Sequence, residues 1–163
     1  MLELLISIVD SIRNEFMERE NLEPAFGSVI YTQLGFGSME HSGIYLLNGE
    51  VVELNGDGQI HIVSLKEFTG RLTTFNDDIY VPCYADYDGT IATPGTGGNA
   101  LEMAGSIRNY NLLIDNCHQF CAGCVTGDFE NSSNFLWMLK DVVKEAAGTE
   151  VVWKKWNWKK NFD

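Results

Sequence analysis

The hexapeptide at residues 115–120, Asp-Asn-Cys-His-Gln-Phe, holds the side chains of this chain best suited to chemistry. The apolar run 110–114 ends in Asp115 and Asn116, which are both good residues for the start of a helix. Apolar residues then recur at helical spacing. Cys117 is therefore predicted in the first turn of a helix, where unpaired backbone N–H groups favour thiolate over thiol. Such a cysteine is a candidate nucleophile, and it needs a base.

His41 is the best candidate for that base. It opens an expected strand, 41–46, in which Gly43 leaves space beside the imidazole. Asn48-Gly49 then signals a hairpin turn to a second strand, 50–54. A two-residue Asn48-Gly49 loop would place Glu53 on the face opposite His41, whereas a three-residue loop, with Gly49 left-handed, places both on one face.

Apolar segregation favours the three-residue loop, because a slip of one residue would expose the apolar face of the hairpin. In this register Ile44, Leu46, Val52 and Leu54 share one buried face, and His41, Gly43, Val51 and Glu53 share the other. Glu53 is then diagonal to His41 and within reach to orient it. Cys117, His41 and Glu53 are thus predicted as nucleophile, base and orienter. His61 is expected on a strand surface, as an alternative orienter.

The three clustered cysteines allow two other chemistries. Cys117, Cys121 and Cys124 form C-x3-C-x2-C, a spacing used for iron–sulfur clusters, but only about a quarter of the chain follows it, too little for the barrel such enzymes need. Zinc bound by these cysteines and His118 would need all four ligands on one short helix. Packing of Cys121 and Cys124 between helix and sheet is favoured instead, so no metal and no cofactor are expected.

The order of elements predicts a single α+β domain over residues 1–163, with an antiparallel sheet packed against the Cys117 helix. The N-terminal helix spans 1–22, the core motifs 27–127, the C-terminal helix 134–147 and a Trp/Lys tail 151–160. Ser64 and Glu67 have the spacing of a capping box for a short helix, and residues 86–99 are expected as a loop before a helix at 100–108. Strands are expected at 28–33, 41–46, 50–54, 59–63, 79–84 and 151–158.

Composition restricts the class of partner. The chain has 163 residues, 45% hydrophobic and 21% charged, and a net charge of −12. Such an acidic chain is unsuited to nucleic-acid backbones, so no nucleic-acid partner is expected. The apolar N-terminus has no basic leader or small-residue cleavage site, and three of the four cysteines share one expected helix. A cytoplasmic, reducing setting is therefore expected, with the oligomeric state left open.

The tail combines tryptophan and lysine, residues that are both at home at a membrane interface. Peripheral membrane contact through Trp153, Trp156 and Trp158 is one expectation, and a final strand with exposed lysines is the other. The overall acidity of the chain opposes tight adsorption.

Two blocks of the sequence resemble a known family. His41-Ser42-Gly43-Ile44-Tyr45 with Val51-Val52-Glu53-Leu54, and later residues 110–120 around Cys117, resemble the signature blocks of the lecithin:retinol acyltransferase-like (LRAT-like) family. This family belongs to the circularly permuted branch of the NlpC-type, papain-like cysteine enzymes, in which the His strand precedes the Cys helix. The resemblance covers about residues 27–127.

The resemblance implies a permuted papain-like fold, with Cys117 as nucleophile and His41 as base. Glu53 takes a place where the family often has a second histidine, and His118 one that is commonly acidic in the acyltransferases. Members are thiol acyltransferases, phospholipases, amidases or peptidases, and some relatives are non-enzymatic. We therefore expect a cysteine hydrolase or acyltransferase that acts on lipid-like esters or amides. A cell-wall type peptidase or amidase, and a silent interaction module, are the alternatives.

Overall fold

The computed structural model describes residues 4–8, 23–34, 39–70, 77–108 and 116–162. Residues 4–8 are helical, as expected for the N-terminal segment. Most of the helix expected over residues 1–22 lies outside the described residues, and so does the apolar segment 110–114 with Asp115.

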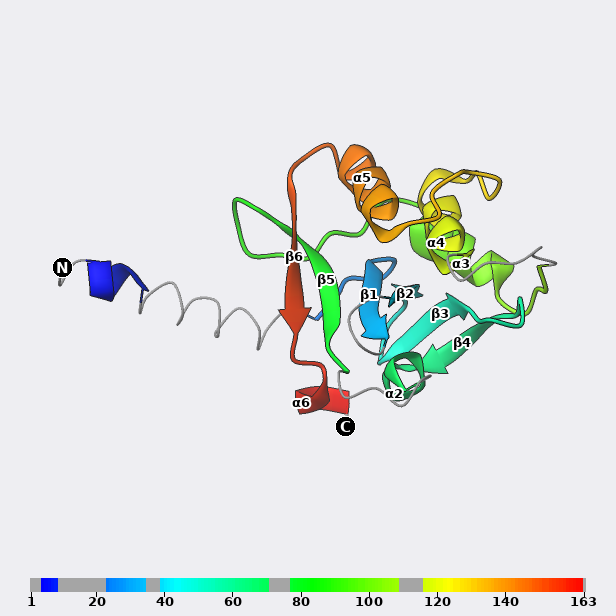
Figure 1. The fold of residues 1–163 in the computed structure, drawn as a ribbon, viewed down its shortest axis with the longest axis horizontal. Coiled ribbons are helices and arrows are strands. Elements are labelled where there is room, and N and C mark those ends of the chain that lie inside the picture. The colour runs from blue at the N-terminus through cyan, green and yellow to red at the C-terminus, as the bar shows by residue number, and fades with distance from the viewer. Residues whose placement is uncertain (1–3, 9–22, 35–38, 71–76, 109–115, 163) are drawn as a thin grey trace.

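The described chain is an α+β structure built on a six-stranded sheet (Figure 1). Its strand order is β4-β3-β2-β1-β5-β6, and every neighbouring pair is antiparallel. This confirms the predicted antiparallel sheet. The strands are β1 (Val29–Leu34), β2 (Met39–Tyr45), β3 (Glu50–Leu54), β4 (Ile60–Ser64), β5 (Ile79–Tyr84) and β6 (Val151–Trp156).

Helices cover both faces of this sheet (Figure 1). One apolar cluster packs α3, α4 and α5 against β2 and β3, while a second, on the opposite face, includes α2 and the C-terminal tryptophans. The sheet therefore separates two apolar clusters. The helices are α2 (Leu65–Thr69), α3 (Thr96–Met103), α4 (Asn116–Thr126), α5 (Leu136–Ala147) and α6 (Lys159–Phe162).

The β2–β3 hairpin has the predicted register. Ile44 pairs with Val52 and Tyr45 with Val51, and the Leu46 N–H donates to the Glu50 carbonyl. Gly49 has a φ of 77°, in the left-handed region that glycine adopts without strain. The predicted apolar face, Ile44, Leu46, Val52 and Leu54, is buried in the cluster beneath α4.

Helix α3 begins at Thr96, earlier than the sequence predicted. Residues 96–99 were expected to belong to a loop. Gly97 is held by close packing: a Cβ at this position would lie 2.3 Å from the Phe26 ring. The helix ends at Met103 rather than continuing to Arg108. Two glycines disfavour a helix by local propensity, and contact with a distant part of the chain outweighs that preference here.

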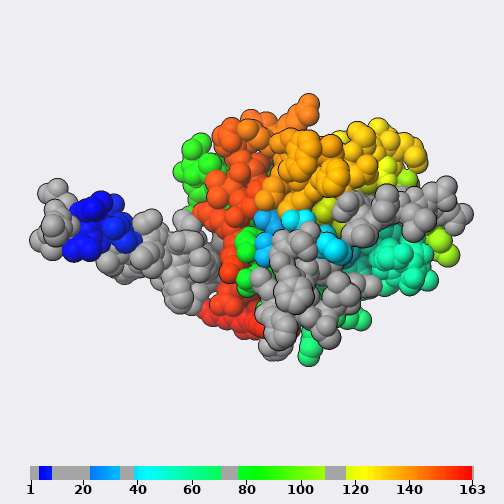
Figure 2. Space-filling view, in the orientation of Figure 1, coloured from blue at the N-terminus to red at the C-terminus, as the bar shows by residue number. Residues whose placement is uncertain are grey.

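The C-terminal strand β6 pairs with β5 along its whole length, from Val151 with Tyr84 to Trp156 with Ile79. Figure 2 shows this segment, in orange-red and red, forming one side of the molecule next to α5. A strand was one of the two interpretations of the tail, and the structure shows it.

The tryptophans of the tail are largely withdrawn from solvent. Trp156 and Trp158 are 2% and 4% exposed, so their rings pack inside the fold, and the membrane contact that the sequence suggested stays a prediction. Trp156 packs edge-on against Tyr45, and the Trp158 Nε1–H donates to the Asp77 carbonyl at 2.9 Å. Trp153 is half-buried near Lys140, whose Nζ lies 5.4 Å from its ring.

Within the described residues, none of the helices combines the length and apolar character needed to cross a bilayer.

Candidate active site

Glu53 and His41 meet on the face of the hairpin that the register predicted. His41 Nε2 lies 2.6 Å from Glu53 Oε2, and both side chains are buried. An ionised carboxylate only accepts hydrogen bonds, so the Nε2–H group donates. This hydrogen bond fixes the orientation of the imidazole. The other ring nitrogen, Nδ1, does not contact Glu53 and can exchange a proton with another group.

The strands separate close to His41. Strand β2 pairs with β1 from Met39 to Ile44, whereas its described pairing with β3 covers the two pairs at the turn end. His41 thus lies beyond the paired part of the hairpin, and α4 packs against both β2 and β3. This divergence lets the first turn of α4 approach a side chain carried by β2.

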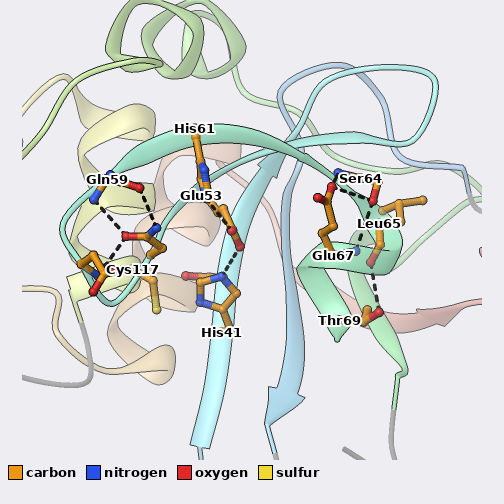
Figure 3. Close-up of polar contacts among 12 residues, drawn as sticks. His41, Glu53, Gln59, His61, Ser64, Leu65, Glu67, Thr69 and Cys117 are labelled. Carbon is orange, nitrogen blue, oxygen red and sulfur yellow. Dashed lines mark hydrogen bonds and ion pairs between the residues drawn. The ribbon is translucent and has the colours of Figure 1, made fainter. Parts of the chain in front are cut away.

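Cys117 lies in the first turn of α4, as predicted. Its thiol is 6% exposed, and Figure 3 shows the sulfur beside the imidazole of His41. Burial raises the pKa of Cys117, but hydrogen bonds from His118 and His41 and their positive charges outweigh it and hold the pKa well below its ordinary value. The arrangement favours the thiolate form of Cys117.

His118 is a second imidazole at the same sulfur. Its Nδ1 lies 3.8 Å from Cys117 Sγ and 2.8 Å from Ser42 Oγ, and its side chain is buried against β2. Ser42 follows His41 along β2, so the two side chains project to opposite faces of the strand, and Ser42 contacts His118. His118 is therefore an anchor between α4 and β2 that also contacts the thiol.

His61 reaches Glu53 from the neighbouring strand. His61 Nε2 lies 3.0 Å from Glu53 Oε1, so the carboxylate is held between two histidines (Figure 3). The structure pairs Glu53 with His61 across β3 and β4. The His61 side chain is 36% exposed on its strand, and its ring lies over the same face as Glu53, in the place expected of an alternative orienter.

A signal for this contact was present in the sequence. Residues 56–58 form a loop like that of the first hairpin, closed by the Asn55 N–H to the Gln59 carbonyl and ending in the left-handed Gly58. Applying the same three-residue rule here pairs Asn55 with Gln59, and hence Glu53 with His61. The Ser42–His118 contact had no such signal, because it depends on how α4 docks.

Phe68 forms a wall beside the base. Its ring centroid lies 5.0 Å from that of His41, and it is fully buried. The predicted capping box holds its helix, since the Ser64 N–H donates to Glu67 Oε2 and the Glu67 N–H donates to Ser64 Oγ. The space that Gly43 leaves is filled by Phe68 and Val51, which a Cβ would approach to 2.9 and 2.7 Å.

The other two cysteines of α4 pack in the core, as predicted. Cys121 and Cys124 are 0% exposed in the cluster between α4 and the sheet. Burial raises the pKa of Cys121 well above its ordinary value and that of Cys124 to about 12. Among the described residues, no three or more His, Cys, Asp or Glu side chains are grouped so as to hold a metal ion.

The structure thus brings Cys117, His41 and Glu53 together and adds His61 and His118 to them. Asp115, predicted at the helix start, lies outside the described residues. No protein-family model matches the sequence, and a search of the curated proteins finds no match to it.

Proposed function

We propose that this protein is a cysteine hydrolase or acyltransferase that forms an acyl-thioester on Cys117. The observation that carries this is the geometry at the start of α4: a thiol with a lowered pKa beside His41, whose other nitrogen bonds a buried carboxylate at 2.6 Å. These are the parts that activate a sulfur nucleophile. We further propose a permuted papain-like arrangement, supported by the chain order, in which the His41 strand precedes the Cys117 helix.

In the proposed reaction the Cys117 thiolate attacks the carbonyl carbon of an ester or amide, and a C–S bond forms. The backbone N–H of Cys117, at the helix start, helps to hold the oxyanion. The C–O or C–N bond then breaks, and the His41 imidazolium gives its proton to the leaving alcohol or amine.

Deacylation reverses the roles of these groups. Water, or an acceptor alcohol or amine, gives a proton to His41 and attacks the thioester carbon. The C–S bond breaks and the thiolate–imidazolium pair is restored. Glu53 keeps its negative charge throughout and stabilises each imidazolium state. The resemblance to the LRAT-like family favours lipid-like acyl groups as substrates. The clustering of three cysteines on one helix supports a cytoplasmic, reducing setting for the reaction.

Reaction with iodoacetamide under native conditions tests the nucleophile. Because peptide mapping reads all four cysteines in one sample, Cys83 and Cys121 serve as internal controls. We expect Cys117 to react at pH 7 about tenfold or more faster than either, since only its thiolate is populated there, and His41→Gln to remove most of this advantage. If Cys117 reacts no faster than Cys83 and is indifferent to His41→Gln, the silent-module alternative holds.

Mass spectrometry of the intact protein then identifies the substrate class. Wild-type protein is incubated with phospholipid vesicles, an N-acyl amide or a muropeptide, with Cys117→Ala as the control. A hydroxylamine-sensitive acyl adduct from the lipid, absent in Cys117→Ala, supports the proposal. Turnover of the muropeptide alone would favour the cell-wall peptidase or amidase.

A further inference from the structure

The carboxylate of Glu53 is engaged at both oxygens. His41 occupies Oε2 at 2.6 Å, and His61 occupies Oε1 at 3.0 Å. The Glu53 side chain is fully buried, whereas the His61 side chain is 36% exposed. A continuous series of contacts therefore runs from Cys117 through His41 and Glu53 to a side chain at the surface (Figure 3).

We propose that His61 is a positioning residue for the thiol chemistry: by donating a hydrogen bond to Glu53 it keeps this buried carboxylate ionised and directed at His41. The inference rests on the proposed function, in which His41 must carry a positive charge beside the Cys117 thiolate. Strand β4, which carries His61, then contributes a residue to the site.

The physical reason lies in the cost of an ionised carboxylate away from water. Such a group stays charged only where hydrogen bonds and opposite charges replace its hydration. Without His61, Glu53 loses this hydrogen bond, and the protonated form of the carboxyl group becomes more favourable relative to the ionised form. A neutral Glu53 no longer stabilises the imidazolium of His41, so the proton returns to Cys117 at a higher pH than in the wild type.

Within the described residues, Glu53 on β3 and Glu67 on α2 are acidic groups that act on His61. Glu67 has a pKa lowered mainly by its hydrogen bonds with Ser64, with a smaller part from the charge of His61. Glu67 is solvent-exposed and engaged in the capping box. Its charge is therefore a through-space influence on His61, separable from the direct contact with Glu53.

The test compares His61→Val, which suits a strand but cannot donate, with His61→Gln, whose amide N–H replaces the ring donor. The readout is the pH dependence of Cys117 alkylation. We expect His61→Val to shift the midpoint upward by about half to one pH unit and, at a pH below the wild-type midpoint, to lower the rate by about three- to tenfold. His61→Gln should stay within about twofold of the wild type at that pH.

Two control variants isolate the contact. Ile62→Ala changes the next residue of β4, which is exposed, and Glu67→Gln removes the through-space charge while keeping a residue that supports a capping box. Both should keep the wild-type pH profile. A purely structural role for His61 would lower the melting temperature and leave the profile in place.

The outcomes separate this inference from the proposed function. If wild-type Cys117 shows no dependence on His41, the proposed function fails. If that dependence is present and His61→Val keeps the wild-type profile, or His61→Gln is shifted as far as His61→Val, the role of His61 is wrong. Should His61→Val not fold, as judged by circular dichroism, His61→Ala takes its place in the comparison.

Discussion

At the scale of single residues, Glu53 is the side chain of the site whose burial costs the most free energy. A buried charge destabilises a fold unless its partners replace the lost hydration, and both oxygens of Glu53 have a histidine partner. The chain retains this carboxylate where an apolar residue would pack at lower cost. The proposed chemistry gives the reason, since the imidazolium of His41 needs a negative charge beside it.

Glu53→Gln should therefore separate charge from geometry. The amide oxygen still accepts from His41 Nε2–H, but the negative charge is gone. We expect the apparent pKa of Cys117 to rise by about one unit, and alkylation at a pH below the wild-type midpoint to slow about tenfold, measured as a pH–rate profile with iodoacetamide.

The matched control is Glu50→Gln, which removes the same charge from an exposed position of the same strand. It should react like the wild type. Equal profiles for Glu53→Gln and the wild type would mean that orientation alone sustains the thiolate, and that the charge of Glu53 has no part in it.

At the scale of elements, the hairpin was predictable because its two faces differ in polarity. A slip of one residue would move Val52 to the face that carries His41 and Glu53 to the face that carries Ile44, so the sequence favours one register. The start of α3 was not predictable in this way, because Gly97 joins the helix through a contact with Phe26, far away in sequence. The docking of His118 on Ser42 likewise depends on tertiary packing, which local patterns do not encode.

Gly43→Ala should test how tightly this packing holds the base. Its φ is not left-handed, so strain comes from contact alone, with a Cβ at 2.7 Å from Val51 and 2.9 Å from the Phe68 ring. Since Phe68 lies against His41, relief of the clash disturbs the imidazole. We expect a loss of about 1–3 kcal/mol in the free energy of unfolding and slower Cys117 alkylation, measured by urea denaturation and labelling.

Gly98→Ala is the matched control, because a Cβ there meets nothing within 4 Å and the residue is helical. It should stabilise the protein by up to about 1 kcal/mol. A Gly43→Ala protein as stable and as reactive as the wild type would contradict the close packing of Val51, Phe68 and His41.

At the scale of the whole molecule, the tryptophans of the C-terminal segment join the sheet to its second core. Trp156 packs against Tyr45 of β2 and against Phe162 of α6. The sequence showed the concentration of tryptophan and lysine, but not which rings would face inward. That depends on the pairing of β6 with β5, which connects residues more than sixty positions apart.

Trp156→Ala should accordingly destabilise the fold by about 3–5 kcal/mol, the range for removing a large buried aromatic side chain. Trp137→Ala is the control, since that ring is 61% exposed, and it should change the free energy of unfolding by about 0.5 kcal/mol or less. Chemical denaturation of the two variants gives both values. Similar small effects for both would show that Trp156 lies at the surface.

Strand β6 also has a consequence for synthesis on the ribosome. The residues of the candidate site lie between positions 41 and 118, whereas the strand that completes the sheet ends at Trp156. While the nascent chain is still short of this point, β5 has an open edge with free backbone groups on the side that β6 will occupy. The thiol site is thus translated before the sheet is complete, and the backbone groups of β5 stay unpaired on this side until β6 has emerged.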